Sequence, residues 1–177
     1  LAALGLFPLW AQRQRPLAPP ANWVEADRAA LAGTQYKTFA SRTLGQEVSY
    51  LLYLPPDYGK EPGRRYPVIY WLHGLNGGQG TGARVFVPHL EAAIKSGKAP
   101  PAIAVLVNGM RDSFYTDSRD GKWPVESVVV KDLVPHIDAT YATLARREAR
   151  AVEGYSMGGF GAAHLGFKYP ETFGLVS

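Results

Sequence analysis

The sequence predicts an α/β fold in which helices cover both faces of a mostly parallel sheet. Two observations predict it: strand-like stretches alternate with helix-like stretches, and the clearest strands are apolar runs without a polar break. The clearest runs are Val68 to Leu72 and Ile103 to Val107. A strand that is apolar on both sides must be covered on both sides, so these runs belong in the middle of the sheet.

The other elements follow from local composition. Two stretches rich in β-branched and aromatic residues, Tyr36–Leu44 and Glu47–Leu54, predict a hairpin that turns at Gly45-Gln46. Helix-compatible stretches and short apolar strands fill the rest of the chain. We expect helices over about 84–96, 125–141 and 160–169, and strands over 149–153 and 173–176.

Three segments are expected along the 177 residues. Residues 1–11, LAALGLFPLWA, match the back half of a secretory signal that would be cleaved after Ala11, and predict a secreted or periplasmic protein. A disordered or docked tail is the alternative for this segment. Residues 12–35 contain three prolines and are expected to form an extended linker. Residues 36–177 then form the folded domain.

Composition excludes several classes of function. The chain carries 19 Lys and Arg against 15 Asp and Glu, a net charge of +4, but the basic residues form no stripe, which argues against nucleic-acid binding. No apolar run approaches the roughly 18 residues that a membrane-spanning helix needs. Cys is absent, which excludes disulfides and thiolate metal sites. No spacing of other ligand residues indicates a metal, and no cofactor is expected.

The strongest chemical signal is Gly154-Tyr155-Ser156-Met157-Gly158, a match to G-x-S-x-G. So short a pattern arises by chance, and a glycine-rich turn closing a strand is the alternative. Here a short apolar strand runs into the motif and a helix-compatible run leaves it. That is the setting of a nucleophile elbow, where a serine on a sharp turn presents its hydroxyl at the sheet edge and small flanking residues avoid collisions.

A second motif follows the first buried strand. His73-Gly74-Leu75-Asn76-Gly77-Gly78 is a glycine-rich loop that exposes backbone amides. Acyl transfer needs two amides aimed at the oxyanion, one in such a loop and one directly after the nucleophile, and these are expected to be Leu75 and Met157. The loop lacks the G-K-[ST] ending of a phosphate-binding loop. His73 is expected to hold the loop rather than to act as a base.

Four segments, YPVIYWLHGLNGG, NGMRDSFYTD, DLVPHID and RAVEGYSMGGFGAAHLGFKYPETF, carry a family resemblance. The chain from about residue 36 resembles the esterase branch of the α/β-hydrolases, which includes feruloyl and acetylxylan esterases, S-formylglutathione hydrolase and the antigen 85 mycolyltransferases. The resemblance implies a three-layer sandwich with Ser156 as nucleophile and Leu75 and Met157 as oxyanion donors. It also implies that the loop Asp112–Asp117, with Ser113, Phe114 and Tyr115 at its centre, lies beside the active site and that Ser113 and Tyr115 bind substrate. The residues alone equally allow an ordinary surface loop there.

The general base is not evident. In this fold the acid and the histidine follow the serine, but His164 and Glu171 are the only such residues after Ser156, and they stand in the wrong order. His164 lies eight residues into the next helix, about 12 Å along its axis. His89 and His136 precede the serine and are expected on or beside helices. We therefore expect an N-terminal fragment of the domain, truncated after the nucleophile helix and inactive alone.

The function predicted for the complete protein is that of a serine carboxylic-ester hydrolase that forms an acyl-enzyme on Ser156, with acyl esters of sugars or polysaccharides as candidate substrates. Two alternatives stay open. The acyl group could pass to a sugar hydroxyl, as the antigen 85 resemblance implies, or the domain could be a catalytically dead binding module.

Overall fold

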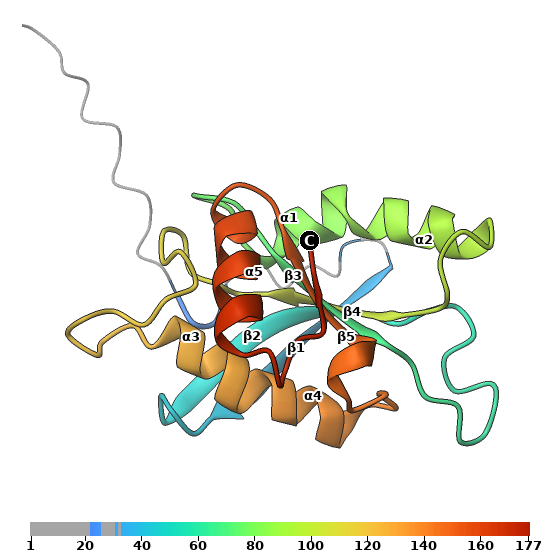
Figure 1. Cartoon of the computed structure of the whole chain (residues 1–177), viewed down its shortest axis with the longest axis horizontal. Helices are drawn as coiled ribbons and strands as arrows, with labels where there is room; N and C mark the ends of the chain where they lie inside the picture. Colours follow the sequence, from blue (N-terminus) through green and yellow to red (C-terminus); the bar gives the residue numbers. More distant parts are fainter. Residues whose placement is uncertain (1–21, 26–30, 32) are drawn as a thin grey trace, which may run out of the picture.

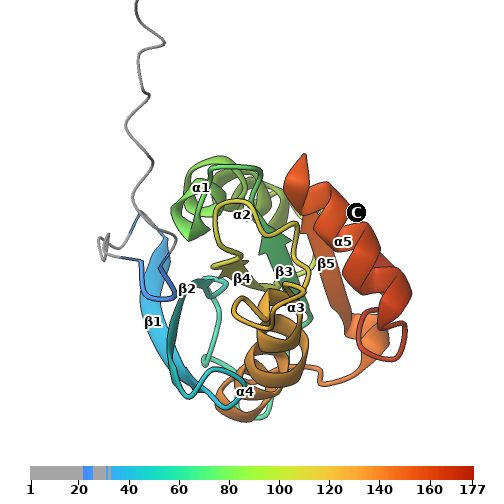
Figure 2. The ribbon, with the colours of Figure 1, turned by 90° about the vertical axis from the view of Figure 1, so that its left-hand side faces the viewer.

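The computed structural model describes residues 22–25, 31 and 33–177. The predicted signal-like segment 1–11 and most of the predicted linker 12–35 lie outside these residues. Within the described part, six strands form one sheet in the order β1-β2-β4-β3-β5-β6. Figures 1 and 2 label the first five strands of this order. In that order the bounds are Thr34–Ser41, Gln46–Tyr53, Ile103–Val107, Val68–Leu72, Arg150–Gly154 and Leu175–Val176.

The sheet is mixed, as the fold class predicted. β1 and β2 form the expected hairpin, in which Ser41 pairs with Gln46, and β2 is also antiparallel to β4. The remaining pairs, β4 with β3, β3 with β5 and β5 with β6, are parallel. The predicted hairpin turn was too short, because β1 ends at Ser41 and Gly45, at a φ of 67°, closes the turn. Left-handed backbone of this kind favours glycine.

Helices cover both faces (Figure 2). On one face lie α1 (Gln79–Val85) and α2 (Val87–Lys95), which pack on Leu51, Trp71 and other core residues. The other face carries α3 (Val125–Ser127), a π-helical segment (Val128–Leu133), α4 (Val134–Thr140) and α5 (Met157–Lys168). A short 3₁₀ turn, Arg147–Ala149, precedes β5. None of the helices in the described ranges is long and apolar enough to cross a membrane.

Two helices differ from the sequence expectation for identifiable reasons. The helix expected at 84–96 begins at Gln79 and breaks at Phe86, because its glycine-rich first part gives no helical signal. Gly82 is needed there, since a Cβ at this position would lie 2.6 Å from the ring of Trp71. The helix expected at 125–141 runs to Thr140 and widens into the π segment before Pro135, which has no N–H to donate to the preceding turn.

Glu126 of α3 ties the helical layer together. Its buried carboxylate lies 2.6 Å from His164 Nε2 and 2.6 Å from Lys168 Nζ, both on α5, and accepts a hydrogen bond from Tyr169. Burial alone would raise the pKa of this carboxyl, but the hydrogen bonds from Lys168, Tyr169 and His164 outweigh it and lower the pKa to about 2. The ionised carboxylate therefore stabilises the packing of α3 against α5.

This geometry predicts acid sensitivity. Because the folded pKa of Glu126 lies below its ordinary value of 4.5, its stabilisation is complete above pH 4.5 and is lost as the pH falls toward 2. Over that window we expect the free energy of unfolding of the parent, relative to Glu126→Gln, to fall by on the order of 3 kcal/mol. Chemical denaturation at several pH values measures it. Parallel pH profiles for the two proteins would contradict the assignment.

Candidate active site

Ser156 occupies the sharp turn between β5 and α5. Its φ of 57° and ψ of −122° lie in a region that a residue with a side chain rarely adopts, and its surface is exposed. Such backbone costs on the order of 1–3 kcal/mol and is retained where it positions a functional group. The structure thus places the predicted nucleophile on a strained elbow that opens to solvent.

The flanking glycines allow this turn because other backbone is packed directly against them. A Cβ at Gly154 would lie 2.5 Å from the carbonyl group of Gly158, and one at Gly158 would lie 2.0 Å from the carbonyl oxygen of Leu72. Real side chains do not tolerate such distances. The N-terminus of α5 is therefore seated directly against the end of β3, where the glycine-rich loop begins.

The loop from His73 to Gly78 presents its middle to solvent. Leu75 is 51% exposed, while Asn76 N donates to Arg111 O at 2.7 Å and Gly77 N to Gly74 O at 3.0 Å. In the described part of the chain, the amides of Leu75 and Met157 donate to no other backbone carbonyl. Met157 is the first residue of α5, where the helix dipole favours negative charge. Both amides are thus available to an oxyanion.

His73 is buried beneath this loop and fixes its first residues through hydrogen bonds. Its Nδ1 lies 2.9 Å from Gly74 O, and Gly109 N donates to its Nε2 at 3.3 Å, so the proton belongs on Nδ1. Burial lowers the pKa of His73 and keeps the ring neutral. The expectation that His73 is structural agrees with these contacts.

The loop after β4 places one of the two predicted substrate-binding residues at a pocket and buries the other. Ser113 donates to Gly109 O, accepts from Tyr115 N at 2.9 Å, and lines a pocket of about 450 Å³. Tyr115 is 0% exposed and donates to His73 O at 3.1 Å. Its ring fills the space that Gly109 and Gly161 leave open, where a Cβ would lie 2.1 Å and 2.4 Å from ring atoms. Tyr115 therefore supports the site from inside rather than forming its surface.

Phe114 and Phe160 form an aromatic edge near the elbow, and of the two only Phe160 had not been predicted as part of the site. Phe114 and Phe160 are 45% and 53% exposed, and their rings meet edge to face with centroids 5.7 Å apart. Phe160 lies one helical turn beyond Ser156, whose carbonyl accepts from Phe160 N at 3.1 Å. The signal available in the sequence was this spacing of four residues, which puts Phe160 at the end of the first turn of α5.

The four histidines of the chain have other partners or positions. His164 Nε2 contacts Glu126, His136 Nε2 lies 3.1 Å from Tyr50 Oη, and His89 is exposed on α2, across the sheet from α5. Among the described residues, no histidine makes a hydrogen bond to Ser156. No group of three or more His, Asp or Glu in the same residues could hold a metal ion.

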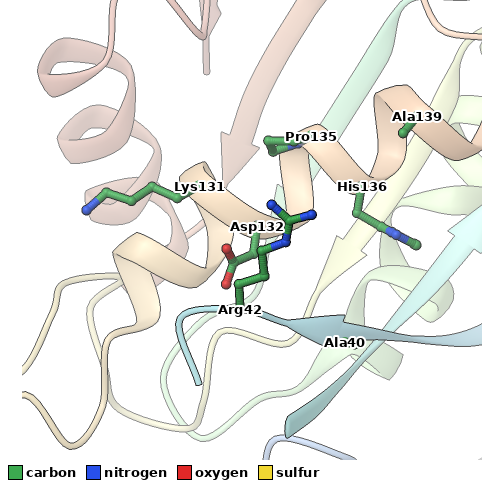
Figure 3. Close-up of a pocket in the computed structure, with 7 residues that line it drawn as sticks. All are labelled: Ala40, Arg42, Lys131, Asp132, Pro135, His136 and Ala139. Carbon is green, nitrogen blue, oxygen red and sulfur yellow. The ribbon is translucent and has the colours of Figure 1, made fainter. Parts of the chain in front are cut away.

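A second pocket, of about 310 Å³, lies between the β1–β2 turn and α4 (Figure 3). Figure 3 shows Arg42 extended alongside Asp132, while Lys131 points away from them. Asp132 already accepts from Ser41 Oγ at 2.5 Å and from Thr43 N at 2.9 Å. His136 is hydrogen-bonded to the hydroxyl of Tyr50. The lining contains no serine, threonine or cysteine, so the candidate site is the one around Ser156.

Known proteins resemble this chain over most of its length. Esterase Rv1288 of Mycobacterium tuberculosis is 34% identical over 145 residues, 80% of this chain and 31% of that protein. An endo-1,4-beta-xylanase/feruloyl esterase of Xylanibacter ruminicola is 33% identical over 152 residues, 79% of this chain and 20% of that protein. A solved ferulic acid esterase matches with a TM-score of 0.72 at 26% identity, covering 79% of this chain and 56% of that one. The chain spans less than a third of the two curated relatives.

The elbow packing predicts a sharp contrast between adjacent glycines. Gly158→Ala should lower the free energy of unfolding by more than about 3 kcal/mol, because its Cβ would overlap the Leu72 carbonyl. Gly159→Ala, whose Cβ would lie 3.4 Å from Gly154 O, should stay within about 1 kcal/mol of the parent. Soluble yield and chemical denaturation of the two variants measure this. Equal stability would show that α5 is not seated on β3 as described.

The family comparison agrees with the site geometry. The family model described as "Putative esterase" matches residues 41–177, which include β2, the glycine-rich loop, the elbow and α5. The fold matches that of esterases of the α/β-hydrolase type over part of their length. The chain therefore belongs to this esterase family.

Proposed function

We propose that the complete protein is a serine carboxylic-ester hydrolase that works through an acyl-enzyme on Ser156. The observation that carries the proposal is the exposed serine on a left-handed elbow, with the Leu75 and Met157 amides left without backbone acceptors. A strained, exposed nucleophile beside such amides has the geometry that acyl transfer requires.

In the proposed reaction, Ser156 Oγ attacks the ester carbonyl carbon and loses its proton to a base. The oxygen of the tetrahedral intermediate takes the negative charge and accepts hydrogen bonds from the Leu75 and Met157 amides. The alcohol then leaves with the proton, and water releases the acid from the acyl-enzyme. The histidine base and its acid are proposed to lie in the complete protein outside these residues, since His73, His136 and His164 have other partners and His89 lies on α2, across the sheet from the serine.

Acyl esters of sugars or polysaccharides are the proposed substrates, with an aromatic acyl group favoured. The exposed rings of Phe114 and Phe160 beside the serine support this choice, because an aromatic acyl group can stack on them. Two relatives carry feruloyl or ferulic acid esterase in their names, which agrees with it. Export is also proposed, on the composition of residues 1–11.

The nucleophile is tested by covalent labelling of the complete protein. A fluorophosphonate probe should label the parent, and Ser156→Ala should abolish both labelling and hydrolysis of p-nitrophenyl acetate. Ser96→Ala, at the exposed end of α2, is the matched control and should keep both. A folded parent that takes no label, or a Ser156→Ala variant that still does, would reject the proposed function.

The aromatic edge is tested by substrate preference. Phe160→Ala should lower kcat/KM for methyl ferulate roughly three- to tenfold, the size of one aromatic contact, and leave p-nitrophenyl acetate within about twofold. Phe167→Ala removes an 81% exposed phenylalanine farther along α5 and should change neither rate. If both esters lose activity equally in Phe160→Ala, the edge does not select the acyl group.

A further inference from the structure

The segment Asn22–Glu25 lies against the same end of the sheet as the candidate site, although the sequence placed it in a linker. Trp23 is buried in the core and its carbonyl accepts from Ser49 N of β2 at 2.8 Å. Asn108, directly after β4, donates through Nδ2 to the carbonyls of Asn22 and Trp23 at 2.9 Å and 3.0 Å. These contacts bind the segment, hereafter the strap, to two neighbouring strands.

Glu25 is anchored through both polar groups of its backbone. Its amide donates to Ser49 Oγ at 3.0 Å, and its carbonyl accepts from Tyr36 Oη at 3.0 Å. Two backbone contacts to different strands fix where its side chain begins. The side chain of Glu25 therefore extends from a backbone whose position is fixed by these two hydrogen bonds.

The carboxylate reaches the end of the glycine-rich loop His73–Gly78, hereafter the oxyanion loop. Glu25 Oε1 accepts from Gln79 N, the first amide of α1, at 2.9 Å. The residue before it, Gly78, has no side chain that could cap this amide, so the cap comes from 54 residues away in sequence. A Cβ on Gly78 would lie 2.8 Å from Glu25 Oε1, which shows how closely the carboxylate packs on the loop backbone.

The loop is thereby held at both ends. At its start, His73 is fixed by Gly109 N and by the hydroxyl of Tyr115. At its end, Glu25 holds Gly78 and Gln79. Leu75, the expected oxyanion donor, lies between these two anchors, and an amide displaced by a fraction of an ångström stabilises an oxyanion less well.

We propose that Glu25 is a positioning residue of the oxyanion hole and that the strap belongs to the catalytic unit. The proposal rests on the proposed function, because it assigns a role within the same site. Glu25 acts through the loop backbone and does not touch the substrate. Its role needs an oxygen acceptor at this position rather than a negative charge, so glutamine can replace it.

The test compares Glu25→Ala with Glu25→Gln in the complete protein. Glu25→Ala should lower kcat for p-nitrophenyl acetate about tenfold, a fraction of the effect of removing an oxyanion donor, with KM within about twofold. Glu25→Gln keeps the acceptor and should stay within about threefold of the parent kcat. Glu148→Ala, which removes an exposed acid from the turn before β5, is the matched control and should be unchanged.

A second measurement reports how firmly the loop is held, without relying on activity. Hydrogen exchange of peptides spanning residues 73–79 should become faster in Glu25→Ala and not in Glu25→Gln. Unchanged kcat in Glu25→Ala, or equal losses in the alanine and glutamine variants, would overturn the positioning role. A parent that neither hydrolyses esters nor takes the fluorophosphonate label would instead reject the proposed function, so the two failures are distinguishable.

Discussion

The site depends on the close approach of two backbones, that of α5 at Gly158 and that of β3 at Leu72. The absence of a side chain at Gly158 lets the first turn of the helix rest on the last carbonyl of the strand. The loop that leaves β3 and the serine that leaves β5 consequently start from neighbouring points. Since parallel strands end at the same sheet edge, one short contact brings the candidate nucleophile and both candidate oxyanion donors together.

Buried side chains beneath this edge of the sheet hold the loops and α5 in fixed positions around the site. Neutral His73 and the ring of Tyr115 connect the loops after β3 and β4, and Tyr115 also packs against Gly161 of α5. Glu126 fixes the far half of the same helix. The hydrogen bonds and ion pairs among these connections satisfy buried polar groups while joining segments distant in sequence, which is how polar networks specify one arrangement of a core.

The parts of the fold that the sequence predicted are those with local signals. Continuous apolar runs located β3 and β4 to the residue, and the glycines around Ser156 located the elbow. What escaped prediction depends on partners far away in the chain. The family resemblance implied that Tyr115 binds substrate, and nothing nearby in the sequence shows that Gly109 and Gly161 leave room for its ring. Likewise, proline content made residues 12–35 read as linker, while the contacts of Trp23 and Glu25 with β2 and α1 carry no local pattern.

Phe114 and Tyr115 are consecutive residues with left-handed backbone, at φ values of 53° and 56°. The conformation sends one ring outward, against Phe160, and the next inward, under the oxyanion loop. Two adjacent residues of one short loop are therefore under different structural constraints. The inner position is constrained by packing, while the outer one can be substituted with little effect on the core, so the proposed contact with the acyl group can change without disturbing the loop beneath it.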